Sequence, residues 1–398
     1  MKNTILLLIL SITTIVSSQT LEWEKSYGGT QIDWTTKILL TNDEGYLAIG
    51  VTNSSNIDVQ GNHGNIDSWV IKLDKNGLLE WQRPYGGTEA DNAYSALKTQ
   101  DGGYLIVGDS RSINGDVTEN KGESDCWLIK IDANGTILWQ KTYGGSEIDR
   151  AYSAIQTNDG GYLFVGHTFS NNGDVFENKG NGDFWIVKIS ETGEIVWEKT
   201  YGGSLFETAT SVIQNQNNEI IITGYTNSTD GDVINQFENM DGWVLKLDIN
   251  GNVIWKKTIG GSGYDRFHSL TNTSENNIVM VGNSTSNDGN VSGNHGERDF
   301  WVVQLDNNGN IIWQNSLGGS NYDSASSVVE TDNKNLIIVG ATASSDGDVS
   351  NLYGESDSWI VKLTKQGDLL WEKTIGGSGN DWANDVIEDS NNNYIITS

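Results

Sequence analysis

The chain has 398 residues, of which 53 are acidic and 24 are Lys or Arg, giving a formal net charge of −29. Nucleic acids and anionic membrane surfaces are bound through basic surfaces, so this balance argues against both as partners. The acidic surface suits cation binding or, more simply, solubility. Cys126 is the only cysteine, which excludes a disulfide framework and a cysteine metal cluster, and its apolar surroundings indicate a small core residue.

The N-terminus is typical of a secretory signal peptide. Lys2 is followed by a mostly apolar run, residues 5–16, and then by the small residues Ser17 and Ser18. The apolar run is too short to cross a bilayer, and no later stretch of the sequence is long and apolar enough. We therefore expect a signal peptide over residues 1–19 and a single domain over residues 20–398, in a secreted or cell-surface protein.

Tryptophan recurs with a fixed stride of 58 residues, which indicates one supersecondary unit copied in tandem. Because a residue present in every copy builds the unit, we expect these side chains to be core anchors and not platforms for sugar stacking. One series comprises Trp23, Trp81, Trp139, Trp197, Trp255, Trp313 and Trp371, and the other comprises Trp69, Trp127, Trp185, Trp243, Trp301 and Trp359.

Residues 149–203 illustrate one repeat. Four runs of β-forming residues are separated by two short turns, at 158–161 and 191–194, and by a long polar loop at 169–182. The first turn, Asn-Asp-Gly-Gly, offers residues that accept positive φ, as a tight hairpin demands. Four antiparallel strands per repeat are typical of a propeller blade, so we predict an all-β protein with the β-propeller fold.

The repeats predict a ring of about seven four-stranded blades, the last incomplete. Six full periods are flanked by an extra fourth strand at residues 21–27 and by a first and second strand at residues 382–398. We expect these halves to pair and close the ring, with the off-series Trp34 and Trp382 together at the seam. The final run stops where the other copies continue, so we expect the complete protein to extend further.

The run KIDANGTILWQKTYGG at residues 130–145 is similar to the tryptophan-docking motif of quinoprotein-type propellers, although the spacing from Asp132 to Trp139 is one residue shorter. In that family an Asp, a Gly and a Trp lock adjacent blades together. The family's vicinal cysteine pair and quinone site have no match, so the resemblance implies architecture and no redox cofactor. The whole repeat, with DGGYL, GDV and KTYGG, more closely resembles secreted propeller-repeat proteins of Bacteroidota. That resemblance implies type IX secretion and labels such as endoglucanase.

Asp recurs in the run Gly-Asp-Val within the polar loop between the second and third strands. Closely spaced carboxylates and amides on a Gly-bent backbone suit a hard cation such as calcium. The EF-hand order of ligands and its closing Glu are absent from the sequence, so hydrogen-bonded turn chemistry is the other interpretation. The candidate calcium ligands are Asp116, Asp174, Asp232 and Asp348, and Asn290 takes their place in one copy.

Two further carboxylate series recur in the repeat. Paired carboxylates can perform glycosidase acid–base chemistry, but acceptors in every copy can also cap backbone N–H groups at strand ends. One series precedes the third-strand Trp by two residues: Asp67, Asp125, Asp183, Asp241, Asp299 and Asp357. The other follows Gly-Gly: Asp33, Asp91, Asp149, Glu207, Asp265, Asp323 and Asp381. The histidines, which are not in metal-ligand spacing, are His63, His167, His268 and His295.

The sequence therefore predicts a secreted β-propeller that acts as a non-catalytic recognition or scaffold module, monomeric and binding an extracellular glycan or protein. The alternative is a glycan-active enzyme, an endoglucanase-like glycoside hydrolase. No residue that is unique to one copy forms a site on the sequence alone, so the ligand stays open. Calcium is the one candidate cofactor.

Overall fold

The computed structural model describes residues 20–234, 236–237 and 239–398, and the predicted signal peptide over residues 1–19 lies outside them. Every named element in the described part is a β-strand. Within the same residues, no helix has the length and apolarity that a membrane span requires.

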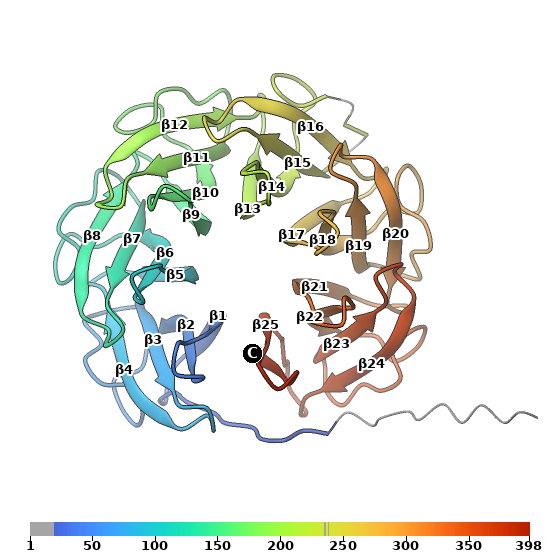
Figure 1. Ribbon diagram of the computed structural model, residues 1–398, viewed down its shortest axis with the longest axis horizontal. Helices are drawn as coiled ribbons and strands as arrows, with labels where there is room; N and C mark the ends of the chain where they lie inside the picture. The colour runs from blue at the N-terminus through green and yellow to red at the C-terminus, as the bar shows by residue number, and fades with distance from the viewer. Residues whose placement is uncertain (1–19, 235, 238) are drawn as a thin grey trace, which may run out of the picture.

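Consecutive strands form antiparallel four-stranded blades arranged around a ring (Figure 1). Blade 1 comprises β1 (Asp33–Leu40), β2 (Tyr46–Thr52), β3 (Asp67–Leu73) and β4 (Leu79–Tyr85). Blade 2 comprises β5 (Asp91–Lys98), β6 (Tyr104–Ser110), β7 (Asp125–Ile131) and β8 (Ile137–Tyr143). Blade 3 comprises β9 (Asp149–Gln156), β10 (Tyr162–Thr168), β11 (Asp183–Ile189) and β12 (Ile195–Tyr201).

The second half of the ring repeats this arrangement and ends in a smaller sheet. Blade 4 comprises β13 (Glu207–Gln214), β14 (Ile220–Thr226), β15 (Asp241–Leu247) and β16 (Val253–Ile259). Blade 5 comprises β17 (Asp265–Asn272), β18 (Ile278–Ser284), β19 (Asp299–Leu305) and β20 (Ile311–Leu317). Blade 6 comprises β21 (Asp323–Glu330), β22 (Leu336–Thr342), β23 (Asp357–Leu363) and β24 (Leu369–Ile375). Blade 7 comprises β25 (Asp385–Glu388) and β26 (Tyr394–Thr397).

The first strand of each blade lies innermost in the ring and the fourth strand outermost (Figure 1). Third strands such as β3 are buried along their whole length, because neighbouring blades cover both faces of the sheet. This explains why the third-strand runs are nearly continuous apolar residues and do not alternate. The all-β propeller predicted from the repeat is confirmed.

The third-strand tryptophans are the core anchors that the repeat predicts. All six are at most 2% exposed, and Trp301 stacks on Phe267 with ring centroids 4.5 Å apart and an interplanar angle of 14°. Five of the six indole N–H groups donate to a Gln or Glu on the fourth strand, as Trp127 does to Gln140 at 2.8 Å. Each blade therefore buries one large aromatic ring without leaving its polar atom free, except at Trp243, whose Nε1 has no partner.

The fourth-strand tryptophans are half-buried and lock adjacent blades. The Trp81 ring packs against the Asp-x-Asn-Gly turn of the next blade, 3.0 Å from the position that a Cβ would take on Gly135. Gly135 has φ of 78°, so this position excludes other side chains both by backbone conformation and by contact. Trp197 packs in the same way on Gly251 and is half-buried, less than its predicted role as a full core anchor requires. The docking implied by the resemblance to quinoprotein-type propellers is thus present.

The closure of the ring differs from the prediction. Residues 20–32 form no strand, so the ring has six complete blades and a two-stranded seventh. Tyr27 still donates its hydroxyl to Gly77 O at 2.5 Å, as Tyr85 does to Gly135 O at 2.6 Å, so the stretch docks on blade 1 as a fourth strand would. It cannot pair, because a fourth strand bonds to a third strand and the described residues contain none in blade 7.

Side chains of the first strands close the ring instead. Lys37 Nζ on β1 contacts Asp385 on β25 at 2.9 Å, and Asn384 Nδ2 donates to Thr35 O at 2.8 Å. Trp34 lies on β1, whereas Trp382 lies three residues before β25 and donates Nε1 to Ser356 Oγ of blade 6. That the two rings lie together at the seam stays a prediction.

A candidate binding site on the inner rim

The two recurrent carboxylate series meet at the seams between blades. Asp91 accepts hydrogen bonds from Gly87 N at 2.6 Å, from Ser112 Oγ at 2.8 Å and from the Ser110 hydroxyl. Asp67, from the preceding blade, accepts from His63 N at 2.8 Å through one oxygen only. Both side chains are fully buried. These groups tie loops to strand ends, as the structural interpretation of both series predicts.

Glycine separates the two carboxylates at each seam. A Cβ placed on Gly86 would lie 2.6 Å from Asp91 Oδ2 and 2.7 Å from Asp67 Oδ1, so only glycine fits there. The same Oδ1 atom lacks a hydrogen-bond partner in all six members of the series: Asp67, Asp125, Asp183, Asp241, Asp299 and Asp357. Burial, and in second place the facing carboxylate, raises the pKa of Asp241 to about 7, although Phe237 N donates to its other oxygen.

The Gly-Asp-Val carboxylates bind the same glycine through the backbone. Asp116 Oδ2 accepts from Gly86 N at 3.2 Å, and Asp348 Oδ2 accepts from Gly318 N at 3.2 Å. Asn290 accepts from Gly260 N at 3.3 Å in the copy without an Asp, so a neutral amide oxygen serves equally well. Asp174 and Asp232 make the same bond and also pair with a lysine. Among the described residues, no three acidic, His or Cys side chains are placed to share a metal ion.

Excess calcium is expected to leave the thermal unfolding midpoint unchanged over the millimolar range, because the four Gly-Asp-Val carboxylates already accept protein hydrogen bonds. A ligand that binds only the folded state would raise the midpoint by mass action. Thermal unfolding with calcium and with a chelator provides the measurement. A midpoint that rises with calcium and falls in the chelator would restore the calcium interpretation of Asp116, Asp174, Asp232 and Asp348.

The histidines divide into two kinds. His63 and His295 occupy the same repeat position, and each ring contacts the nearby third-strand carboxylate, Asp67 or Asp299, at 2.8 Å. His167 and His268 have no counterpart in the other copies. His167 is 4% exposed, and burial, then the charge of Arg150, lowers its pKa to about 3.

His167 belongs to a set of positions at which the repeats do not agree. The set, here called the inner rim, consists of the residue after each recurrent carboxylate that follows Gly-Gly and the next-to-last residue of the second strand in blades 1 to 6. In blades 2 and 3, for example, these two residues pair across neighbouring strands. Its members are Trp34, Val51, Asn92, Asp109, Arg150, His167, Thr208, Tyr225, Arg266, Asn283, Ser324, Ala341 and Trp382. In every complete blade the second-strand member is preceded by Gly and followed by Ser or Thr, so the inner rim is a place where the blades differ between positions that repeat.

Contacts between blades run along the inner rim. Asp109 of blade 2 accepts from Asn92 Nδ2 at 3.3 Å and from Ser124 Oγ at 2.5 Å, and it lies 3.9 Å from Arg150 Nε of blade 3. His167 Nδ1 lies 3.0 Å from Thr208 Oγ1 of blade 4. The side chains are therefore held in place before any ligand arrives.

The same pattern continues in blades 4 to 6. The guanidinium of Arg266 lies over the Tyr225 ring, 5.1 Å from its centroid. Asn283 Nδ2 donates to Ser324 Oγ at 2.8 Å. Three inner-rim side chains keep a buried polar atom without a hydrogen bond in the described structure: Arg150 Nε, His167 Nε2 and Asn283 Oδ1. Buried polar atoms are normally paired, so these are places where a ligand or a water has hydrogen bonds to gain.

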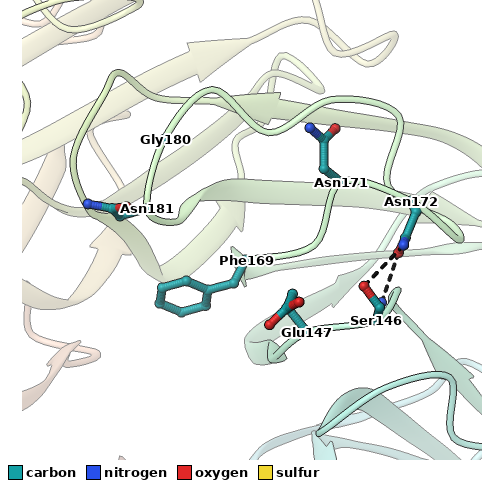
Figure 2. Close-up of a pocket in the computed structure, with 7 residues that line it drawn as sticks. All are labelled: Ser146, Glu147, Phe169, Asn171, Asn172, Gly180 and Asn181. Atoms are coloured by element: carbon teal, nitrogen blue, oxygen red, sulfur yellow. Dashed lines mark hydrogen bonds between the residues drawn. The ribbon is translucent and has the colours of Figure 1, made fainter.

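Aromatic side chains extend the inner rim outward on the face that carries the β2–β3 type loops. Phe169 and Phe206 stack with centroids 5.7 Å apart, and the His167 ring lies edge-on to both, at 5.2 and 5.4 Å. Beyond Phe169 lies an open depression of about 490 Å³ (Figure 2). It is lined by Ser146, Glu147, Phe169, Asn171, Asn172, Gly180 and Asn181.

The depression combines one aromatic face with polar donors and acceptors. In Figure 2, Phe169 lies between Asn181 on one loop and Glu147 on another. Ser146 and Asn172 hold the two loops together, through Ser146 N to Asn172 Oδ1 at 2.8 Å and Asn172 Nδ2 to Ser146 Oγ at 3.0 Å. Glu147 is its only lining carboxylate, whereas glycosidases use two carboxyl groups on either side of the bond they cleave.

Two indole rings of the inner rim, from Trp34 and Trp382, are exposed in blades 1 and 7. Trp34 is 49% exposed and Trp382 is 54% exposed, whereas every third-strand tryptophan is buried. Trp382 is fixed by a hydrogen bond from Nε1 to Ser356 Oγ at 3.0 Å. Exposed tryptophans that are held in one orientation are typical of binding surfaces.

Comparisons with known proteins support the fold. No family model matches the chain, and no curated protein is similar to it. The WD40 domain of Neurospora crassa Pan2 is similar in structure, with 14% identity, a TM-score of 0.52 and coverage of 92% of this chain and 86% of that domain. Drosophila Plexin A, solved in complex with Semaphorin 1b, matches at 9% identity and a TM-score of 0.51, covering 94% of this chain and 84% of that one.

A protein of unknown function from Bacteroides caccae also matches, with 11% identity and a TM-score of 0.42, over 84% of this chain and 97% of that one. At such identities the likeness concerns the fold alone, and the fold does not determine function.

Proposed function

We propose that the chain is a secreted, non-catalytic recognition module that binds a glycan or protein over the inner rim. The observation that carries this proposal is the contrast between repeat positions. The buried seams and core anchors are nearly the same in every blade, while the inner rim holds different residues in each. Positions needed only to build the ring have no reason to differ, so the differences mark the surface that meets a ligand.

The chemistry of the rim favours binding over hydrolysis. The recurrent carboxylates, the glycosidase candidates of the sequence, are buried apart from the half-buried Asp33 and Asp381. They are engaged in hydrogen bonds, as Asp67 and Asp91 illustrate. Asp109 is the only acidic member of the inner rim, and it is fully buried against Ser124 and Asn92. A substrate at the rim would therefore not meet two accessible carboxylates at hydrolytic spacing.

Replacing Trp34 or Trp382 with alanine is expected to weaken ligand binding by about tenfold or more, since exposed tryptophans often carry a large share of binding energy. Because both rings are half-exposed, the thermal midpoint should change little. A glycan array and a panel of extracellular proteins, with hydrolysis assays on the same preparation, provide the measurement.

Phe176→Ala is the matched control, because Phe176 is 88% exposed in the β10–β11 loop and lies outside the inner rim. This variant should keep full binding. Binding that survives both tryptophan substitutions would remove the rim from the proposal, and release of reducing sugar would favour the glycoside hydrolase instead.

A further inference from the structure

The arginines of this acidic chain gather at one place. The five arginines are Arg83, Arg111, Arg150, Arg266 and Arg298. Arg150 and Arg266 belong to the inner rim, and the other rim positions contain one acidic residue, Asp109, and no lysine. Among the rim members themselves arginines therefore outnumber acidic side chains, in a chain whose formal net charge is −29, and a buried carboxylate directly precedes each of the two arginines. The guanidinium groups are the part of the rim that can pair with an anionic ligand.

Arg111 and Arg298 lie on the margin of the same rim. The backbone N–H of Arg111, directly after β6, donates to Ala90 O at 3.0 Å. Arg298, directly before β19, forms a β-bridge with Tyr322, and its guanidinium lies 4.8 Å from the centre of that ring. Only Arg83, on the outer strand β4, is remote from the rim.

The packing of these side chains leaves hydrogen-bond donors free. Stacking on Tyr225 and Tyr322 occupies a face of the Arg266 and Arg298 guanidinium groups, and Arg266 Nε donates to Met240 Sδ at 2.8 Å. The terminal N–H groups at the edge are the ones that would bind a carboxylate. Arg150 Nε is buried and makes no hydrogen bond in the described structure, although Asp109 Oδ2 lies 3.9 Å away. The guanidinium fork matches the two oxygens of a carboxylate, which a lysine ammonium does not.

Groups that suit sugar binding lie elsewhere around the ring. The exposed rings of Trp34 and Trp382 offer apolar faces, and the depression beside Phe169 offers amides from Asn171 and Asn181 that suit hydroxyl groups. Resting on the proposed recognition function, we propose that the inner rim binds an acidic glycan, in which carboxylate-bearing sugars pair with Arg266 and Arg298 while neighbouring rings stack on the tryptophans.

An oligogalacturonide tests the proposal, with its methyl ester as the matched neutral ligand. Calorimetry at two salt concentrations should detect binding of the acid form that weakens as salt rises, and binding of the ester at least about tenfold weaker. Arg266→Gln and Arg298→Gln should each weaken binding of the acid about tenfold. Arg83→Gln makes the same change in net charge away from the rim and should leave binding unchanged. Thermal midpoints verify that each variant is folded.

Three results would overturn this inference. If the ester binds as tightly as the acid, or if Arg83→Gln loses as much affinity as the rim variants, the rim arginines do not recognise carboxylates. A poly-glutamate peptide that binds as tightly as the sugar would assign the site to acidic peptides. In each case the proposed recognition function still stands if binding of some ligand depends on Trp34 and Trp382. If no glycan and no protein binds at the rim, both the recognition function and the acidic-glycan proposal are wrong.

Discussion

Replacing Trp301 with alanine is expected to lower the free energy of unfolding by about 3–5 kcal/mol. The side chain is fully buried, stacks on Phe267 and donates Nε1 to Gln314 at 3.3 Å, so the substitution opens a cavity that the stiff blade cannot fill. Denaturant titration followed by circular dichroism provides the measurement.

Trp313 of the same blade is the control, because it is half-buried and docks on Gly367 of the next blade. Trp313→Ala should lower the free energy of unfolding clearly less than Trp301→Ala, because folding removes less apolar area of Trp313 from water. Equal losses at both positions would contradict the division between core anchors and docking residues.

Asp241→Asn is expected to stabilise the protein at pH 8 and to lose about 3 kcal/mol of that advantage at pH 5. Burial raises the pKa of Asp241 to about 7, above the ordinary carboxyl value near 4, so the folded protein binds a proton there that the unfolded chain releases. The native state therefore bears the full cost of the charged group above pH 7, and that cost falls as pH drops toward the unfolded pKa. An amide in its place is neutral at every pH.

Comparing variant and parent at each pH isolates this group from others that titrate. Burial lowers the pKa of His167 to about 3 and that of His268 to about 4, so these histidines cost stability as pH falls below about 6.5. Their contribution cancels in the difference. Asp248→Asn is the matched control, because this exposed carboxylate accepts from the Asn252 side-chain amide and from Asn252 N and Asn250 N, which lower its pKa. It should destabilise slightly, and an advantage of Asp241→Asn that does not depend on pH would refute the explanation.

The repeat allows most of the fold to be predicted from the sequence. Trp127 and its equivalents indicate the buried third strand, and Gly135 in its Asp-x-Asn-Gly turn indicates the docking surface for Trp81. Both predictions rest on local chemistry that recurs in each blade. The closure could not be predicted in the same way, because pairing of residues 21–27 depends on a partner strand and not on their own pattern.

The candidate site was harder to predict for a related reason. Attention to recurrent residues such as Asp116 leads to the seams, where the carboxylates serve the ring itself. The informative signal was variation and not recurrence: Trp34, Asn92, Arg150 and Thr208 occupy one repeat position and differ in chemistry. An alignment of the copies would have found this position. That this position lies beside Asp109 and His167 can be seen only in the three-dimensional structure.

The individuality of the inner rim breaks the rotational symmetry of the ring. A propeller of identical blades would offer a ligand one equivalent pose per blade, and a bound chain could step around the axis at no cost. Here Trp34 stands in blade 1, Trp382 contacts Ser356 of blade 6, and the Arg266 guanidinium stands in blade 5. An elongated ligand therefore has one preferred orientation around the ring axis and one preferred direction along its own length.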